Sequence, residues 1–497
     1  MSHKTELRNY LSAAGDEKFS DWSEDSPFRQ IDHAKNKLDN ALNKARDLFK
    51  FLDETCEIVG LDVTRASAET QIKIVTDELD AAKTDVAALS FPALGDNWPS
   101  DKAAVSNLTD YVEPEAPVDS PAVAGEARIG VLNALTGPIP DLVAVMLQSE
   151  QAAAAFINAN GGIWNGDKVA LAVGDSACDA KAGVDAATKV VNVEQASIIV
   201  GPVCSGATIG ATQAVTIPAG VVVISPSATS PAITDLDDND TVFRVCPSDA
   251  YQGVTLAKLA RSMGYSKVAT TYANDDYNAG LHDVFVKAFQ DAGGTITADQ
   301  MHEANKASYR SELATLAQGE PEALVLFAYY NGSGITIMRQ SLENGFFSKF
   351  LGGDGMVADQ VIAEIGADNL ADTVFTKGTS DEGSPHFKTY AGLFAKPSDP
   401  YVAQAWDTVM IAALALQRAG EATRDLSEHV RAVTNAPGVK VGPGDWAKAK
   451  KLLEEGKDID YQGAGLGEAD FDENGDVAGL YGKNEVIDGK WVETIVD

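Results

Sequence analysis

Apolar residues in the N-terminal part of the chain recur at helical spacing. They form two runs with alternating steps of three and four residues: Leu38, Leu42, Ala45, Phe49, Leu52, Cys56 and Val59, then Ile72, Val75, Leu79, Ala82, Val86 and Leu89. Such spacing places one narrow apolar stripe along each helix. Because a short break at Gly60 separates the runs, the pattern predicts an antiparallel helical hairpin in a small all-α module over residues 1–112. The two stripes pack on each other, or alternatively they recruit a helix of a partner.

The segment after this module is rich in proline. Residues 113–125 read EPEAPVDSPAVAG and contain Pro114, Pro117 and Pro121. Closely spaced prolines without an apolar period are typical of a semi-rigid linker. The sequence therefore predicts a linker between the helical module and the rest of the chain.

From Ala127 onward, short apolar runs alternate with amphipathic stretches. The predicted strands are Ile129–Leu132, Val169–Val173, Ser197–Val200, Val221–Ile224, Val268–Tyr272, Ala323–Phe327 and Lys349–Gly352. The predicted helices are Val143–Ala159, Ala180–Val193, Ala207–Val215, Gln252–Met263, Ala279–Ala292, Ser308–Leu316, Gly334–Glu343 and Tyr401–Leu416. Apolar strands that alternate with helices indicate an α/β fold, in which helices cover both faces of parallel sheets. Two successive sets of strands predict two doubly wound lobes.

Length and charge restrict the possible partners. The chain has 497 residues and a formal net charge of −34. A length of this kind suggests about three domains. An acidic excess argues against binding to a nucleic-acid backbone or to an anionic membrane surface. No stretch approaches the ~20 apolar residues that a membrane span needs. We therefore expect no nucleic-acid partner and no direct membrane insertion.

The common catalytic and metal-binding motifs are absent from the sequence. It contains no CxxC, HExxH, GxSxG or Walker loop. We therefore expect no enzyme activity, no metal and no cofactor. The stretch from Asp470 to Asp476 resembles a calcium loop, but its twelfth position is Tyr481 instead of glutamate, so it predicts a hairpin turn. The glycines from Gly463 to Gly467 lack the spacing of a dinucleotide loop.

Residues with hydroxyl groups follow several predicted strands. Ser205 comes after the strand that ends at Val200, Thr229 follows the strand that ends at Ile224, and Tyr277 follows a later strand. Ligands of open parallel sheets bind beyond the carboxyl ends of the strands. Exposed N–H groups and hydroxyls at a helix start suit a carboxylate. Alternatively, Ser205 and Thr229 only cap helices.

Several short motifs together identify a family. They are Leu135–Pro138, Ile157–Ile163, Gly201–Ser205, Ile224–Pro231, Phe243–Asp249 and Gly353–Gly355. In this order and spacing, about residues 126–497 resemble the leucine/isoleucine/valine-type solute-binding proteins of ABC importers, which are type I periplasmic binding proteins. Residues 1–120 have no counterpart in that family.

The resemblance implies two ligand-binding lobes joined by a three-strand hinge, with the ligand trapped between them. Lobe 1 would comprise residues 126–246 and 378–470. Lobe 2 would comprise residues 247–377 and 471–497.

The resemblance also implies how an amino acid would be held. Ser205 and Thr229 would bind the α-carboxylate, and Asp354 would face the α-ammonium, where many relatives carry glutamate. The carbonyl of Ser227 would accept a second ammonium bond. This arrangement fits the need to pair both charges of a buried zwitterion. Alternatively, Asp354 is a structural residue of a tight turn.

The walls of the site follow from the same resemblance. Tyr277 and Tyr330 would line the second-lobe side, and Tyr401 matches an aromatic position on the first-lobe side. Leu142 stands where relatives can carry tyrosine, which leaves the preferred side chain open.

The cysteines bear on the compartment. Cys178 and Cys204 match the disulfide pair of the family, whereas Cys246 has no matching partner and is expected to be a buried thiol. A disulfide implies an oxidising compartment, so we expect a periplasmic protein. The polar N-terminus shows no signal peptide, and a native start at Met1 would place the chain in the cytoplasm instead.

These observations favour a solute-binding protein that is not an enzyme. It would capture a branched-chain or other neutral amino acid and deliver it to the membrane permease of an ABC importer. The alternative is an amino-acid-sensing or interaction protein that signals through the N-terminal helical module.

Overall fold

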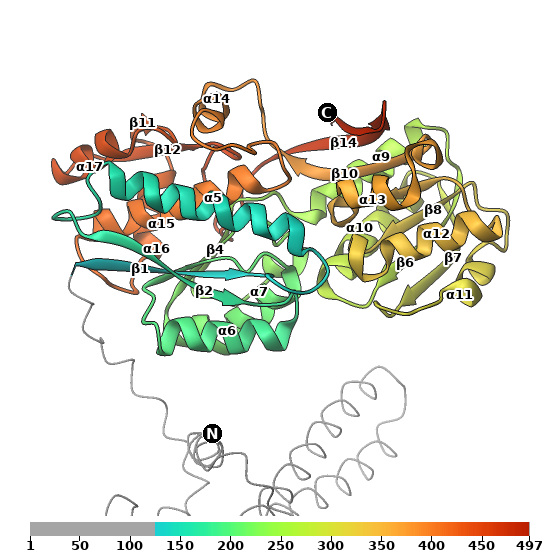
Figure 1. Ribbon diagram of the computed structural model, residues 1–497, viewed down its shortest axis with the longest axis horizontal. Helices are drawn as coiled ribbons and strands as arrows, with labels where there is room; N and C mark the ends of the chain where they lie inside the picture. Colours follow the sequence, from blue (N-terminus) through green and yellow to red (C-terminus); the bar gives the residue numbers. More distant parts are fainter. Residues whose placement is uncertain (1–124, 497) are drawn as a thin grey trace, which may run out of the picture. The chain divides into compact units, whose positions relative to one another are not determined.

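A computed structural model describes residues 125–496. The predicted helical hairpin, most of the linker and Cys56 lie outside the described residues. Within the described part, the elements form two lobes that lie side by side (Figure 1). No helix in this part is both long and apolar enough to cross a bilayer.

The first lobe is built on a parallel five-stranded sheet. Its strands, in spatial order, are β2 (Lys168–Asp175), β1 (Glu126–Asn133), β3 (Ile198–Val200), β4 (Val222–Ser225) and β5 (Val242–Arg244). Helices α6 (Ala180–Asn192) and α7 (Ser205–Ala211) pack on one side, and α5 (Pro140–Ala159) and α15 (Val402–Ala419) pack on the other. The strands β3 and β4 are buried over their full length, which explains their unbroken apolar sequences. Helix α15 is buried almost all round because it is the central helix of this lobe.

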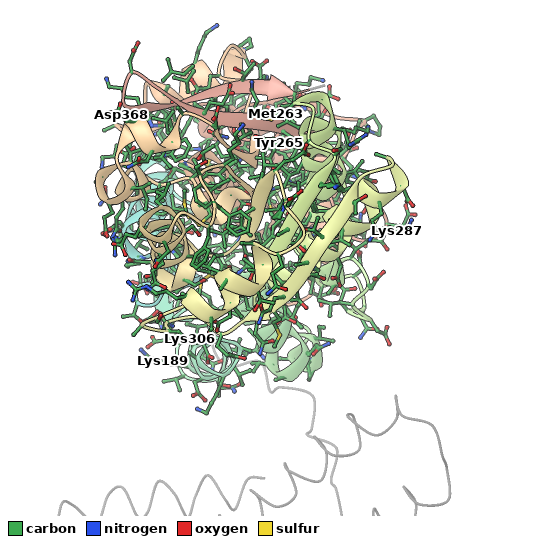
Figure 2. The ribbon with its side chains drawn as sticks, turned by 90° about the vertical axis from the view of Figure 1, so that its right-hand side faces the viewer. Lys189, Met263, Tyr265, Lys287, Lys306 and Asp368 are labelled. Atoms are coloured by element: carbon green, nitrogen blue, oxygen red, sulfur yellow. A yellow bond between two sulfur atoms is a disulfide. The ribbon has the colours of Figure 1, made fainter. Side chains whose placement is uncertain are left out.

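The second lobe contains a mixed seven-stranded sheet. Its order is β15 (Lys490–Val496), β14 (Leu480–Ile487), β10 (Thr373–Thr379), β9 (Phe350–Gly352), β8 (Ala323–Phe327), β6 (Lys267–Ala273) and β7 (Thr295–His302). Strand β14 runs antiparallel to both of its neighbours, β10 and β15, and the five strands from β10 to β7 are parallel to one another. One face carries α9 (Asp249–Ser262) and α10 (Asp276–Asp291), and the helices α11 (Arg310–Leu316), α12 (Ile335–Asn344) and α13 (Asp359–Ile365) cover the other. Figure 2 turns this lobe toward the viewer, with Lys287 of α10 at its edge.

Smaller elements complete the first lobe. A three-stranded sheet contains β11 (Val439–Val441), β12 (Ile459–Gly463) and β13 (Gly467–Glu468). The helices α14 (Pro385–Ala391), α16 (Ser427–Thr434) and α17 (Trp446–Glu454) pack around it and against α15. These elements share the apolar core of the first sheet.

The chain crosses between the lobes three times: after β5, after β10 and before β14. The crossings lie against one another, since a Cβ built on Gly479 would stand 2.7 Å from the Pro247 side chain. The Tyr481 hydroxyl donates to the Ser248 carbonyl at 2.6 Å. The predicted three-strand hinge between two doubly wound lobes is therefore confirmed.

Every strand predicted from an apolar run is present, and so is every predicted helix between Val143 and Leu416. The hairpin predicted around Asp472–Asp476 is wrong. The Asp472 carboxylate accepts from the N–H groups of Asn474 and Asp476, which closes a turn that joins no paired strands. The C-terminal hairpin is instead β14–β15, where Asp488 and Gly489 both have positive φ, as a tight two-residue hairpin turn requires.

Candidate functional site

A cavity of about 30 Å³ lies between the two lobes. The first-lobe side contributes Ile139, Leu142, Met146, Val203, Ser227 and Tyr401, and the second-lobe side contributes Tyr277, Tyr329, Tyr330, Asp354, Gly355 and Val357. Six of the eight predicted binding residues are in this set. A volume of this size holds about two water molecules. An amino acid must therefore separate the lobes or displace side chains to enter.

Asp354 begins a short 3₁₀ turn directly after β9. Its Oδ1 accepts hydrogen bonds from Tyr277 Oη at 2.8 Å and from Gln252 Nε2 at 2.9 Å. Burial raises the pKa of Asp354, and these two hydrogen bonds oppose the rise. The preceding Gly353 permits this contact, because a Cβ there would stand 2.8 Å from Tyr277 Oη.

A second acid, Asp249, lies close to Asp354. It is the first residue of α9 and is fully buried, and neither carboxylate oxygen has a hydrogen-bond partner among the described residues. Burial, and then the charge of Asp354, raise the pKa of Asp249. The Thr229 hydroxyl is near enough to lower that pKa, although it lies outside normal hydrogen-bond geometry. The site thus holds two coupled acids, which suit a cationic group of a ligand.

Tyrosines form the second-lobe wall. The rings of Tyr277 and Tyr329 lie 5.1 Å apart between centroids, at an interplanar angle of 30°. Tyr330 opens a π-helical turn that ends at Gly334. Sequence reasoning named Tyr277 and Tyr330 but missed Tyr329. The sequence feature that could have identified Tyr329 is its position just after the buried strand β8.

Tyr401 closes the cavity from the first-lobe side. It precedes α15 with a φ of 59°, a left-handed conformation that is uncommon for a residue other than glycine. Its hydroxyl is buried and has no hydrogen-bond partner among the described residues. Strained backbone of this kind concentrates at functional sites. The fold therefore holds the Tyr401 hydroxyl near enough to Asp354 to lower the pKa of that carboxyl, although the hydroxyl lies outside normal hydrogen-bond geometry.

Ser205 and Thr229 are not among the residues that line the cavity, although both are fully buried. Ser205 Oγ accepts from the N–H of Ser230 at 3.1 Å, so the two predicted carboxylate loops are in contact. Neither residue caps a helix: Cys204 precedes α7, and Ser230 precedes the turn from Pro231. The capping alternative is therefore wrong, and the expectation that both residues occupy helix starts holds only for Ser205.

Ser227 lines the cavity, and its hydroxyl donates to the Val203 carbonyl at 2.8 Å. The apolar part of the wall comes from Leu142 and its neighbours Ile139 and Met146 on the first-lobe side, together with Val357 from the second lobe. An aliphatic ligand group would be desolvated against this wall.

The predicted disulfide between Cys178 and Cys204 is confirmed, with the two Cα atoms 5.2 Å apart. It ties the loop after β2 to the residue before α7, next to the Ser205 loop. Cys246 is a buried thiol, as expected. Burial raises its pKa far above the ordinary range, so it stays protonated.

Two buried acids, four tyrosines and an aliphatic wall between hinged lobes can hold a ligand with a cationic head and an apolar tail. Among residues 125–496, no group of three or more potential metal ligands is present. This combination of fold and site defines a two-lobed protein with a small-molecule binding site between its lobes.

The family model described as receptor family ligand binding region matches residues 146–482. The chain belongs to this family. It is 30% identical over 364 residues to the Leu/Ile/Val-binding protein BraC3 of Rhizobium johnstonii, which covers 72% of this chain and 90% of that protein. It is also 30% identical to the leucine-, isoleucine-, valine-, threonine- and alanine-binding protein of Pseudomonas aeruginosa over 317 residues, 63% of this chain and 83% of that protein.

Solved structures share the fold. The leucine-binding protein LivK from Thermotoga maritima has a TM-score of 0.63 at 23% identity and covers 75% of this chain and 99% of its own. The branched-chain amino acid transporter substrate-binding protein LivJ from Streptococcus pneumoniae, in complex with isoleucine, has a TM-score of 0.62 at 22% identity, with the same coverage. The resemblance to type I periplasmic binding proteins is confirmed.

Proposed function

We propose that this protein captures a neutral amino acid with an aliphatic side chain between its lobes and delivers it to the membrane permease of an ABC importer. The lobes would comprise residues 126–246 with 378–470 and residues 247–377 with 471–497. The relatives are named for binding leucine, isoleucine and valine, and none of the names reported above is that of an enzyme. An oxidising compartment such as the periplasm suits the Cys178–Cys204 disulfide.

The observation that carries this proposal is the acid pair beside an apolar wall. In the proposed complex, Asp354 and the Ser227 carbonyl receive the ammonium, and Ser205 and Thr229 bind the carboxylate. Tyr277, Tyr330 and Tyr401 enclose the backbone of the ligand. A buried ammonium needs a carboxylate partner, and an aliphatic side chain gains most from the wall at Leu142.

Isothermal titration calorimetry tests the proposal directly. L-Leucine, L-isoleucine, L-valine and L-alanine are expected to bind, whereas isocaproate, which is leucine without its ammonium, is expected to bind at least about a hundredfold more weakly. A saturating amino acid at about a thousand times Kd should raise the free energy of unfolding by about 4 kcal/mol. If none of the natural amino acids binds, or if isocaproate binds as tightly as leucine, the proposal is wrong.

The double substitution Ser205→Ala and Thr229→Ala is expected to weaken leucine binding without unfolding the protein. Each lost hydrogen bond to a charged group costs about 1.5–3 kcal/mol, so the affinity should fall by a factor of a hundred or more. Calorimetry measures the affinity, and circular dichroism checks the fold. Ser262→Ala on the surface of α9 is a matched control that should bind normally. Unchanged affinity in the double variant would place the carboxylate elsewhere.

A further inference from the structure

A buried arginine fixes one of the proposed ligand loops. Arg244 ends β5, and its side chain is completely buried. Its Nη1 donates to the Ser230 carbonyl at 2.8 Å and to the Ala228 carbonyl at 3.3 Å. Its Nε and Nη2 donate to the two carboxylate oxygens of Asp476 at 2.5 and 2.8 Å. One guanidinium therefore joins the loop that contains Thr229 to an acid 232 residues farther along the chain.

The two carbonyls that Arg244 holds flank Thr229 directly. The Thr229 carbonyl accepts from the N–H of Asp249 at 2.8 Å, and the N–H of Ser230 donates to Ser205 Oγ. The loop backbone is thus fixed on both sides of Thr229, while the Thr229 hydroxyl is buried without a hydrogen-bond partner among the described residues. The position of that hydroxyl depends on the arginine.

Asp476 lies in the third crossing between the lobes, as the last residue of the turn that resembles a calcium loop. The N–H of Arg244 donates to the Gly475 carbonyl at 3.0 Å, and Thr234 Oγ1 donates to Asp476 Oδ2 at 2.8 Å. A fork-to-fork arginine–carboxylate pair has a strict geometry, so it transmits the position of one segment to the other. The acidic turn therefore contributes Asp476 to an ion pair beside the proposed binding site.

We propose that the Arg244–Asp476 ion pair is a positioning device for the ligand site: it fixes the backbone around Thr229 and sets the net charge that faces Asp249. The inference rests on the proposed function. Arg244 and Asp476 are positioning residues, since their polar groups are engaged with the loop and with each other.

Several ionisable groups surround Asp249. Its own pKa responds to the charges of Asp354 and Arg244, and its charge acts in turn on Cys246, Tyr277, Tyr329, Tyr401 and Tyr481. Asp354 disfavours ionisation of Asp249, and Arg244 favours it. The cysteine and the tyrosines stay neutral because burial raises the pKa of each. Removing the charge of Arg244 therefore raises the pKa of Asp249, whereas removing the counter-charge of Asp476 lowers it.

The test compares Arg244→Gln with Asp476→Asn by calorimetry with L-leucine between about pH 4 and pH 8. Both variants disturb the same clamp, so both should lose about tenfold or more in affinity at neutral pH. The pH at which affinity falls on the acid side should move upward in Arg244→Gln, because the pKa of Asp249 rises when the neighbouring positive charge is removed. It should move downward in Asp476→Asn, because the arginine charge is no longer neutralised. A merely structural clamp would lower affinity without these opposite shifts.

Asp240→Asn is the matched control. Asp240 pairs with Arg431, which also donates to the carbonyls of Phe471 and Asp472, but this pair does not contact the Thr229 loop. The control should keep the wild-type affinity and pH profile. If Arg244→Gln does not fold by circular dichroism, Arg244→Lys replaces it: it keeps the charge but not the fork, so it should lose affinity without an upward shift.

The outcomes separate two failures. If the wild-type protein binds leucine and both variants keep its affinity, the positioning role is overturned and the proposed function stands. The same holds if the pH at which affinity falls on the acid side shifts in the same direction in both variants. If the wild-type protein binds no amino acid, the proposed function fails, and this inference fails with it.

Discussion

Asp354→Asn is expected to abolish leucine binding while the ligand-free protein becomes no less stable. The substitution removes the charge opposite the ligand ammonium, and an uncompensated buried charge costs about 3–5 kcal/mol. The dissociation constant should therefore rise by a factor of roughly a hundred to several thousand. Without ligand, Asp354 and Asp249 are two buried acids whose pKa values are both raised, so losing one charge relieves the folded state. The amide oxygen still accepts from Tyr277 and Gln252.

Calorimetry measures the first effect, and thermal unfolding without ligand measures the second. Asp368→Asn is the control, since Asp368 is exposed on the second lobe (Figure 2) and should change neither quantity. Isocaproate provides a second control: its weak binding should not weaken further in Asp354→Asn, because it has no ammonium. A variant that binds leucine within about threefold of the wild type would show that Asp249 alone holds the ammonium.

The sequence predicted the buried parallel strands that consist of unbroken apolar runs, because such runs have few alternatives. It missed β5 and β10, which are also buried and parallel, because β5 has three residues and β10 contains several polar ones. Strands such as β4 and β8 are buried at every position, so their composition indicates their structure. The edge strand β7 was missed because it is largely half-exposed and reads TITADQMH. The antiparallel strands β14 and β15 were missed for a related reason, since their polar and apolar residues mix on a partly exposed edge.

Part of the site was predicted from residues at strand exits, whereas the roles of Asp354 and Ser227 were predicted from the family resemblance. Asp354, Tyr277 and Ser227 follow buried strands and do line the cavity. Tyr329 was missed although it precedes Tyr330, because adjacent residues of an ordinary helix face different directions. Here Tyr329 stands just before a π-helical turn that begins at Tyr330, and both rings reach the cavity.

Ion pairs between residues far apart in the chain could not be predicted from the sequence. Arg244 and Asp476 belong to segments that meet only because the chain crosses between the lobes three times. Spacing along the chain contains no information about which acid of the C-terminal turn faces the arginine. The same turn was therefore predicted as a hairpin, whereas its final aspartate supports the ligand loop.

The second prediction with a large expected effect concerns Glu150 and the stability of the protein. Glu150 lies on α5 in the first lobe and is completely buried, with Oε2 accepting from Asn133 Nδ2 at 2.6 Å. Its Oε1 and Asn133 Oδ1 have no partner among the described residues. Burial raises the pKa of Glu150 from 4.5 to about 8, against the opposing effect of the Asn133 hydrogen bond. The folded protein therefore holds a proton at neutral pH that the unfolded chain releases.

The sign of the pH dependence follows. Because the folded pKa of Glu150 is raised, the contribution of Glu150 to the free energy of unfolding is greatest below pH 4.5 and falls as the pH rises toward about 8. The slope is about 1.4 kcal/mol per pH unit, which makes the loss about 3 kcal/mol by pH 7. Glu150→Gln should remove this loss, since its amide is neutral and can donate to Asn133 Oδ1, so the variant should be more stable than the wild type at neutral pH by about that amount. Urea unfolding at several pH values measures the difference, with the exposed Glu421→Gln as a control that should follow the wild type. A Glu150→Gln variant with the wild-type slope would show that Glu150 is ionised in the folded protein.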